Sequence, residues 1–180
     1  FSVNQKDSPI INLESILGKK PLLAICYGAQ LIAKSLNGNV ENSNSREYGR
    51  AKLSFIDSNC KLFKNINIDN QVWMSHGDTI TSLPNDSKLI ASTDSVVNAA
   101  YSIESLSLYA LQFHPEVFHT ENGFKIFENF FINELKFIKE WNPESFIDRT
   151  VDDLKKKLTD DKVILGLSGG VDSSVAAVLL

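Results

Sequence analysis

A cysteine marks the junction between a strand-like and a helix-like segment near the start of the chain. Residues 21–25 (PLLAI) form the short apolar run of a buried strand, and Cys26 follows directly. From Ala29 onward, apolar residues recur at helical spacing. A side chain at so tight a turn projects from the sheet edge, and the helix N-terminus behind it favours a thiolate. The pattern predicts a nucleophile elbow, with the Tyr27 amide as an oxyanion donor. The alternative is a cysteine packed as a small apolar residue.

A thiol nucleophile needs a base and a group that orients the base. Of the three histidines, His114 ends a strand-like run and is followed by Pro115 and Glu116. The Glu116 carboxylate can turn back to the imidazole and fix its tautomer. His76 lies in "WMSHGD", which we interpret as a binding loop, and His119 is interpreted as structural. The sequence therefore predicts a cysteine–histidine–glutamate triad.

A second candidate site is the glycine loop "LGLSGGVDSS", residues 165–174. It follows an apolar strand-like run and opens a helix, where backbone N–H groups can cradle an anion. The loop lacks the Gly-Lys-Ser/Thr of the Walker type and does not fit the dinucleotide pattern G-x-G-x-x-G. We therefore predict a phosphate site of another kind.

Strand-like and helix-like segments alternate along most of the chain, which favours an α/β architecture. The strand candidates are residues 21–25, 51–56, 71–75, 88–92, 97–102 and 108–113. One helix follows the elbow, and a second is expected over about 123–139. Asn142 and Pro143 suit the cap and first turn of a third helix, after which a buried strand leads into the glycine loop. We place a domain boundary near residue 140.

Composition narrows the possible functions. The chain has 180 residues, of which 43% are hydrophobic, and a formal net charge of −4. These values support a packed core and argue against a nucleic-acid partner. No apolar run has the length of a membrane helix and no secretory signal is recognisable, so we expect a cytoplasmic protein with reduced thiols and no membrane partner. Because the chain begins at Phe1 and stops inside an apolar helical pattern, we expect a fragment of a longer protein.

Three motifs occur in a combination that resembles one family. "ICYGAQ", "FHPE" and "SGGVDSS", supported by "REYGRA" and "WMSHGD", are similar to the glutamine-hydrolysing GMP synthases over nearly the whole chain. The elbow alone would fit many amidotransferases, and the loop alone would fit asparagine synthetase, NAD synthetase or tRNA-thiolating enzymes. The resemblance implies a class I glutamine amidotransferase (flavodoxin-like) domain in residues 1–140 that lacks its N-terminal part. Residues 141–180 would be the first strand, loop and helix of an adenine nucleotide alpha hydrolase-like ATP pyrophosphatase domain.

The resemblance also implies roles for individual residues. Cys26 would attack the side-chain amide of glutamine, and His114, oriented by Glu116, would transfer the proton. The residues implied to hold the substrate glutamine are Tyr27, Gln30, Ser75 and Asp78. The residues implied to grip the pyrophosphate of ATP are Ser168, Gly169, Gly170, Val171, Asp172, Ser173 and Ser174.

Further implications concern substrates and assembly. Ammonia would pass to the second domain, where ATP, as its magnesium complex, adenylates the 2-oxygen of xanthosine monophosphate before ammonia displaces AMP. No metal site of the protein itself is expected, and the parent enzyme is expected to be a homodimer. Two other classes remain: a stand-alone glutaminase whose partner synthetase is a separate chain, against which the glycine loop argues, and a non-catalytic regulatory domain. The presence of both Cys26 and His114 argues against the latter.

Overall fold

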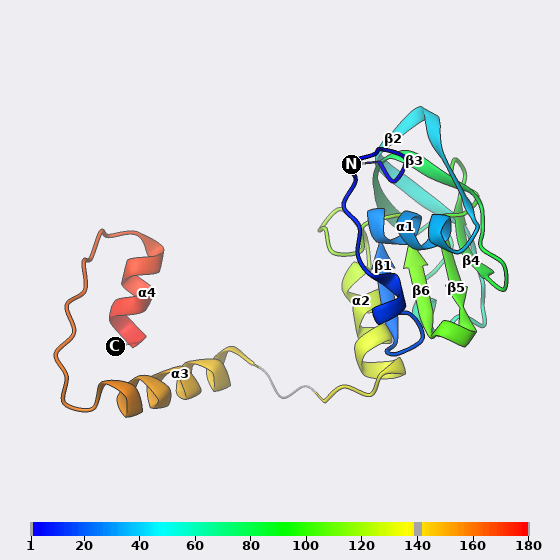
Figure 1. The fold of residues 1–180 in the computed structure, drawn as a ribbon. Coiled ribbons are helices and arrows are strands. Elements are labelled where there is room, and N and C mark those ends of the chain that lie inside the picture. The colour runs from blue at the N-terminus through cyan, green and yellow to red at the C-terminus, as the bar shows by residue number, and fades with distance from the viewer. Residues whose placement is uncertain (1, 139–141, 180) are drawn as a thin grey trace. The chain divides into compact units, whose positions relative to one another are not determined.

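The computed structural model describes residues 2–138 and 142–179, with the backbone alone described for residues 43–47. The chain divides into two compact units, Phe1–Phe137 and Ile138–Leu180 (Figure 1). The predicted boundary near residue 140 falls on residues outside those described, so it stays a prediction.

A six-stranded mixed sheet forms the centre of the first unit. Its spatial order is β1-β6-β5-β4-β2-β3. Strands β1 and β6 are parallel, whereas the other neighbours are antiparallel. The strands are β1 (Leu22–Ile25), β2 (Asn39–Ile56), β3 (Gln71–Ser82), β4 (Lys88–Thr93), β5 (Ala100–Ile103) and β6 (Leu108–Leu111). With the helices described below, this confirms the α/β class.

Two strands are much longer than their apolar runs predict. β2 begins twelve residues before the expected 51–56, and β3 extends past the expected 71–75 as far as Ser82. The first part of β2 pairs with β3, and its last residues pair with β4. The first part of β2 is polar and has no apolar run, so its strand conformation is stabilised by backbone hydrogen bonds to β3. The segment "WMSHGD" is consequently strand rather than the loop that we expected.

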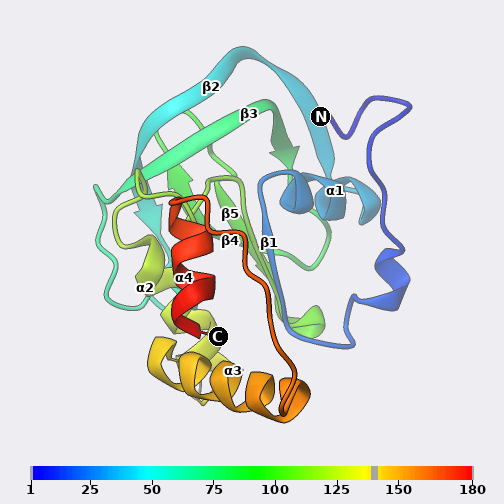
Figure 2. The ribbon, with the colours of Figure 1, turned by 90° about the vertical axis from the view of Figure 1, so that its left-hand side faces the viewer.

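Helices cover both faces of this sheet (Figures 1 and 2). Helix α1 (Tyr27–Ser35) packs in a core cluster with Leu108 and Ala110 of β6. Helix α2 (Gly123–Glu128) packs in a second cluster with Leu111 of the same strand. Because alternate residues of a strand point to opposite faces, the two clusters lie on opposite sides of the sheet.

The helix expected over 123–139 changes character halfway. After α2 the chain continues as a π-helix, η4 (Asn129–Glu134), and ends earlier than its apolar spacing indicates. Asn129 is fully buried, and its side-chain amide donates to the carbonyls of Leu62 and Lys64, both at 2.9 Å. A π-helix has a wider turn than an α-helix, and this one begins at Asn129, whose buried side-chain amide is bonded to carbonyls outside the helix.

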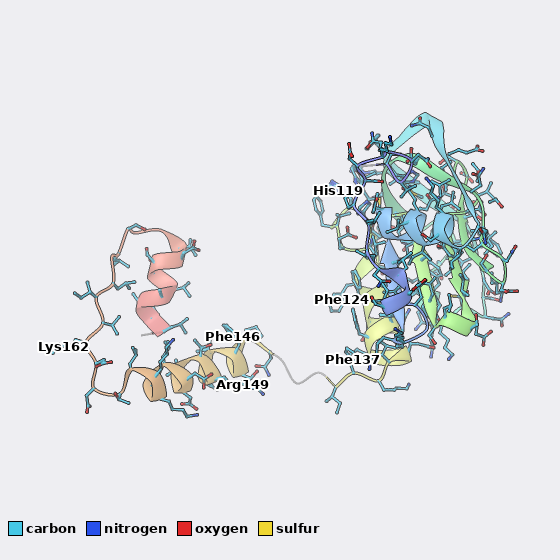
Figure 3. The ribbon with its side chains drawn as sticks, viewed as in Figure 1. His119, Phe124, Phe137, Phe146, Arg149 and Lys162 are labelled. Carbon is cyan, nitrogen blue, oxygen red and sulfur yellow. The ribbon has the colours of Figure 1, made fainter. Side chains whose placement is uncertain are left out.

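The second unit contains helices α3 (Pro143–Leu158) and α4 (Val171–Leu179). The predicted start of α3 is confirmed, because the Asn142 side chain accepts from the Ser145 N–H at 2.7 Å in a capping box. The strand expected before the glycine loop does not form: the segment around Lys162 is extended and exposed (Figure 3). A strand needs a neighbour for its backbone groups, and none is present among the described residues. None of the described helices is long and apolar enough to cross a membrane.

Candidate active site

Cys26 occupies the turn between β1 and α1 with an unusual backbone. Its φ and ψ are 49° and −107°. Its N–H donates to the carbonyl of Leu111 on β6 at 2.7 Å, and its own carbonyl accepts from Gln30 N–H at 3.1 Å. The backbone is thus fixed on the sheet and on the helix, and the thiol is held at the tip of the turn. This is the arrangement of a nucleophile elbow.

His114 and Glu116 lie beside this thiol. Nδ1 of His114 is 2.5 Å from Oε1 of Glu116. The other ring nitrogen, Nε2, is buried and has no nitrogen or oxygen partner among the described residues. Hydrogen bonding to the Cys26 thiol is the main influence that raises the pKa of His114, to about 9; burial opposes it and Glu116 adds to it. The histidine is therefore protonated at neutral pH, and Glu116 occupies Nδ1, which leaves Nε2 for the thiol.

Strand β3 passes close to the same thiol. The carbonyl oxygen of Ser75 lies 3.8 Å from Sγ of Cys26. The next residue, His76, points into the core, with Nε2 3.3 Å from the sulfur of Met74. Burial lowers the pKa of His76, so its imidazole is neutral at physiological pH. Of these two histidines, His114 is the one hydrogen-bonded to the Cys26 thiol, whereas the ring of His76 contacts Met74.

The structure gives the other predicted glutamine-binding side chains definite partners. The Tyr27 hydroxyl donates to the carbonyl of Pro9 at 2.6 Å. Gln30 is only 2% exposed, and its amide donates to the backbone carbonyl of Asp78 at 2.7 Å, which ties α1 to β3. The Asp78 carboxylate accepts from the Ser2 hydroxyl and from the amide of Asn42. Assigning these residues to substrate binding stays a prediction.

Two buried polar residues near the site are not among those that the sequence motifs indicate. Gln112, fully buried, accepts from the Gln30 amide at 3.3 Å and donates to the Asn98 carbonyl at 3.0 Å. The sequence signal that could have identified Gln112 is the presence of a glutamine inside the apolar run 108–113. Thr120 ends the family-like stretch "FHPEVFHT" (113–120), and it bonds to the backbone of both Trp73 and His114, a role that the motif itself does not indicate.

The glycine loop of the second unit is shaped by its serines. Gly169 has a φ of 80°, a conformation that favours glycine. The Ser168 hydroxyl is 3.0 Å from that of Ser173, and Ser174 donates from its hydroxyl to the Gly170 carbonyl at 2.9 Å. The loop then opens the nine-residue helix α4, whose first-turn acidic residue is Asp172. All of these loop residues are exposed or half-buried.

Neither unit holds a ready-made metal centre within the part of the chain that the structure describes. No group of three or more His, Cys, Asp and Glu side chains there is placed to bind an ion. Magnesium bound with nucleotides commonly takes one or two protein carboxylates and completes its shell with phosphates and water.

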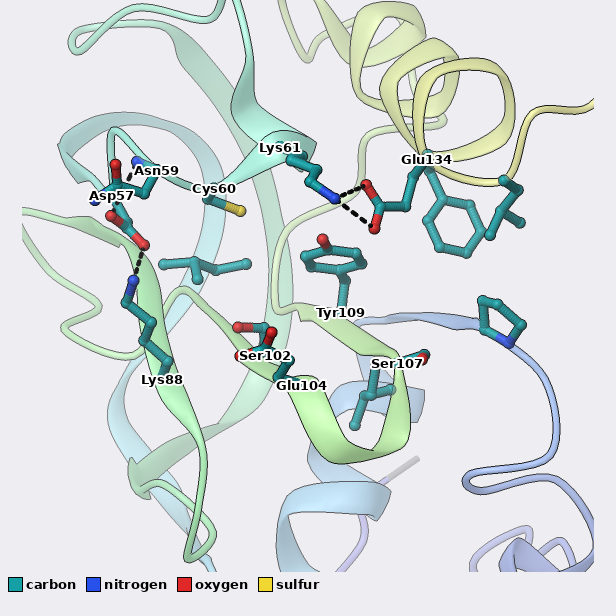
Figure 4. A pocket seen from close by; sticks show the side chains of 15 residues that line it. Asp57, Asn59, Cys60, Lys61, Lys88, Ser102, Glu104, Ser107, Tyr109 and Glu134 are labelled. Atoms are coloured by element: carbon teal, nitrogen blue, oxygen red, sulfur yellow. Dashed lines mark hydrogen bonds and ion pairs between the residues drawn. The ribbon is translucent and has the colours of Figure 1, made fainter.

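A pocket of about 470 Å³, drawn in Figure 4, has none of Cys26, His114 and Glu116 in its lining. It is lined by Leu108 and Tyr109 at the start of β6, whereas His114 lies beyond the end of that strand. Ion pairs frame it, such as Lys88 with Asp57 at 2.5 Å. Burial raises the pKa of the thiol of its cysteine, Cys60, which disfavours the thiolate form there.

Known proteins resemble the chain along its whole length. The family described as glutamine amidotransferase class-I matches residues 4–134, and that described as NAD synthase matches residues 144–180. A glutamine-hydrolysing GMP synthase of Bacteroides thetaiotaomicron is 54% identical over all of this chain and 36% of its own length. One of Flavobacterium psychrophilum is 52% identical over all of this chain and 35% of its own length. The chain thus spans about a third of the length of these relatives.

A solved structure agrees with the first of these matches. A Thermoplasma acidophilum protein, described as a candidate component of GMP synthase, superposes with a TM-score of 0.58 and 38% identity, covering 61% of this chain and 55% of its own. The sheet, the elbow and the triad residues lie within the part matched as glutamine amidotransferase class-I. The chain belongs to the class-I glutamine amidotransferase family.

Proposed function

We propose that the protein hydrolyses glutamine at Cys26 and supplies the ammonia to the synthesis of GMP. The observation that carries the proposal is the pairing of the elbow cysteine with His114, whose Nδ1 is held by Glu116. The similarity to glutamine-hydrolysing GMP synthases over the whole chain supports the choice of reaction.

The first step is an attack by the thiolate sulfur on the side-chain carbonyl carbon of glutamine. The amide N–H of Tyr27, at the start of α1, has no acceptor within the helix and can stabilise the developing oxyanion. The C–N bond then breaks, and protonated His114 donates from Nε2 to the departing nitrogen. Ammonia and a thioester result. His114, now neutral, takes a proton from water, whose oxygen attacks the thioester to release glutamate and the thiol.

The second step of the proposal uses the glycine loop. Backbone N–H groups at the start of α4 suit the pyrophosphate of ATP, and the Ser168, Ser173 and Ser174 hydroxyls lie beside them. ATP would adenylate the 2-oxygen of xanthosine monophosphate, and ammonia would displace AMP. Magnesium would be held mainly by the phosphates, and Asp172, in the first turn of α4, would supply a carboxylate to it. We further propose a cytoplasmic homodimer as the working assembly.

The experiment compares nitrogen sources in the full-length enzyme. Cys26→Ala is expected to abolish glutamate release and glutamine-dependent GMP formation while leaving GMP formation from added ammonium, because the thiol serves only to release ammonia. Cys60→Ala is the matched control, since its thiol lies in the pocket whose lining has no triad residue, and should retain both activities. Equal loss of the two activities in a folded Cys26→Ala enzyme would contradict the proposal.

A further inference from the structure

The hydroxyl of Thr120 joins two backbones next to the triad. It accepts from the N–H of Trp73 at 3.0 Å and donates to the carbonyl of His114 at 2.5 Å. Thr120 is 5% exposed, so both bonds are shielded from water. The residue lies six positions after His114, beyond Pro115 and Glu116, and has no contact with the thiol recorded in the structure.

These bonds form a second link between two backbones that are already joined directly. The N–H of His114 donates to the carbonyl of Trp73 at 2.9 Å. The second link runs from the Trp73 N–H through the Thr120 hydroxyl to the His114 carbonyl. Trp73 and His114 are thus held together at both of their backbone polar groups.

Strand β3, which contains Trp73, also passes close to the Cys26 thiol. Trp73 lies two residues before Ser75, whose carbonyl is 3.8 Å from Sγ of Cys26. Fixing His114 to Trp73 therefore fixes the imidazole relative to the thiol. Glu116 sets the ring orientation through Nδ1, and Thr120 sets the backbone from which the ring projects.

We propose that Thr120 is a positioning residue that holds His114 at its working distance from Cys26. The inference rests on the proposed glutamine hydrolysis for its kinetic test. Other bonds keep the remainder of the loop in place, because the Glu121 N–H donates to the Gln71 carbonyl at 2.9 Å and the Gln71 amide to the His119 carbonyl at 2.7 Å. Loss of the hydroxyl therefore acts locally on His114.

The test compares two substitutions of nearly equal size in the full-length enzyme. Thr120→Val keeps the shape but leaves the Trp73 N–H and the His114 carbonyl unpaired, whereas Thr120→Ser keeps the hydroxyl. We expect Thr120→Val to lower kcat for glutamine hydrolysis by about tenfold or more with KM little changed, and Thr120→Ser to restore most of the rate. The matched control is Thr93→Val, which removes a buried hydroxyl that accepts from the Val96 N–H at 3.0 Å.

A second readout is independent of the substrate. The pH dependence of Cys26 alkylation by iodoacetamide, located by peptide mapping, reports the thiol–imidazole pair directly. A shifted profile in Thr120→Val alone supports the positioning role, even if the wild type proves not to hydrolyse glutamine. The role is overturned if Thr120→Val and Thr93→Val lower the melting temperature alike and the alkylation profile and kcat do not move. It is also overturned if Thr120→Ser loses as much kcat as Thr120→Val.

Discussion

His114 keeps its proton to a higher pH than a free histidine does. Hydrogen bonding to the Cys26 thiol raises its pKa from 6.5 to about 9, against the opposing effect of burial and with a smaller contribution from Glu116. Between these two values the native state binds a proton that the unfolded chain does not. The linked stabilisation is therefore complete below pH 6.5 and is lost as the pH rises through about 9.

We expect this linkage to appear in the free energy of unfolding. Relative to His114→Gln, the wild type should lose on the order of 2 kcal/mol as the pH rises through this window, measured by urea unfolding at a series of pH values. Cys26→Ala removes the largest cause and should shrink the loss. The lowered pKa of His76 acts only below pH 6.5, outside the window. If the free energy of unfolding of His114→Gln fell by the same amount over this pH range, a group other than His114 would be responsible for the loss.

At this scale the sequence predicts what is local and misses what is distant. Glu116 is two residues from His114, so their pairing follows from the chain itself. Thr120 meets Trp73 across 47 positions, and only the fold brings them together. The motif that contains Gln30 implies a role in holding glutamine, which stays a prediction, but only the fold shows that its amide also bonds to the Asp78 carbonyl on β3.

Among the elements, the contact between α2 and the loop that carries His114 and Glu116 is unusually close. Gly123 is the first residue of α2, and a Cβ added there would overlap the carbonyl of Pro115. Pro115 lies between His114 and Glu116. Only a glycine allows the helix to begin so near to these two side chains.

A methyl group at this position should therefore disturb catalysis through the loop. We expect Gly123→Ala to lower kcat for glutamine hydrolysis by about tenfold to a hundredfold, since displacements near 1 Å can have effects of that size. Gly166→Ala is the matched control, because its Cβ would meet nothing within 4 Å. A Gly123→Ala enzyme with unchanged kcat would mean that the loop yields without moving His114.

Element types followed from periodicity better than element lengths did. The apolar runs identified the sheet and the helices of the first unit, because burial on one face leaves a period in the sequence. The first half of β2 has no such run, since pairing with β3 sustains it. The segment before the glycine loop has an apolar run but no strand, because no described neighbour pairs with it.

Across the whole molecule, the two units differ in how much they bury. The first contains two clusters of buried apolar residues, whereas α3 and α4 of the second contain no buried residue. Burial of apolar surface is the main source of cooperative stability. The units should therefore behave differently when each is studied alone.

We expect residues 1–137 to unfold in one cooperative thermal transition and residues 138–180 to melt gradually without one. Circular dichroism of the two separate polypeptides measures this. In the second, helicity should come mainly from α3, which has the capping box at Asn142. A sharp transition for residues 138–180 would contradict the assignment of the core to the first unit alone.

The left-handed backbone at Cys26 has a consequence for the protein's history. A φ of 49° at a residue other than glycine costs about 1–3 kcal/mol. Glycine would relieve that cost, so selection for resistance to unfolding alone would remove the thiol from this turn. A reactive thiol at this turn is thus obtained at the expense of some folding stability. We expect a library of variants sorted only by abundance to enrich glycine at position 26, whereas under the proposed function a library sorted by glutamine turnover should keep cysteine there.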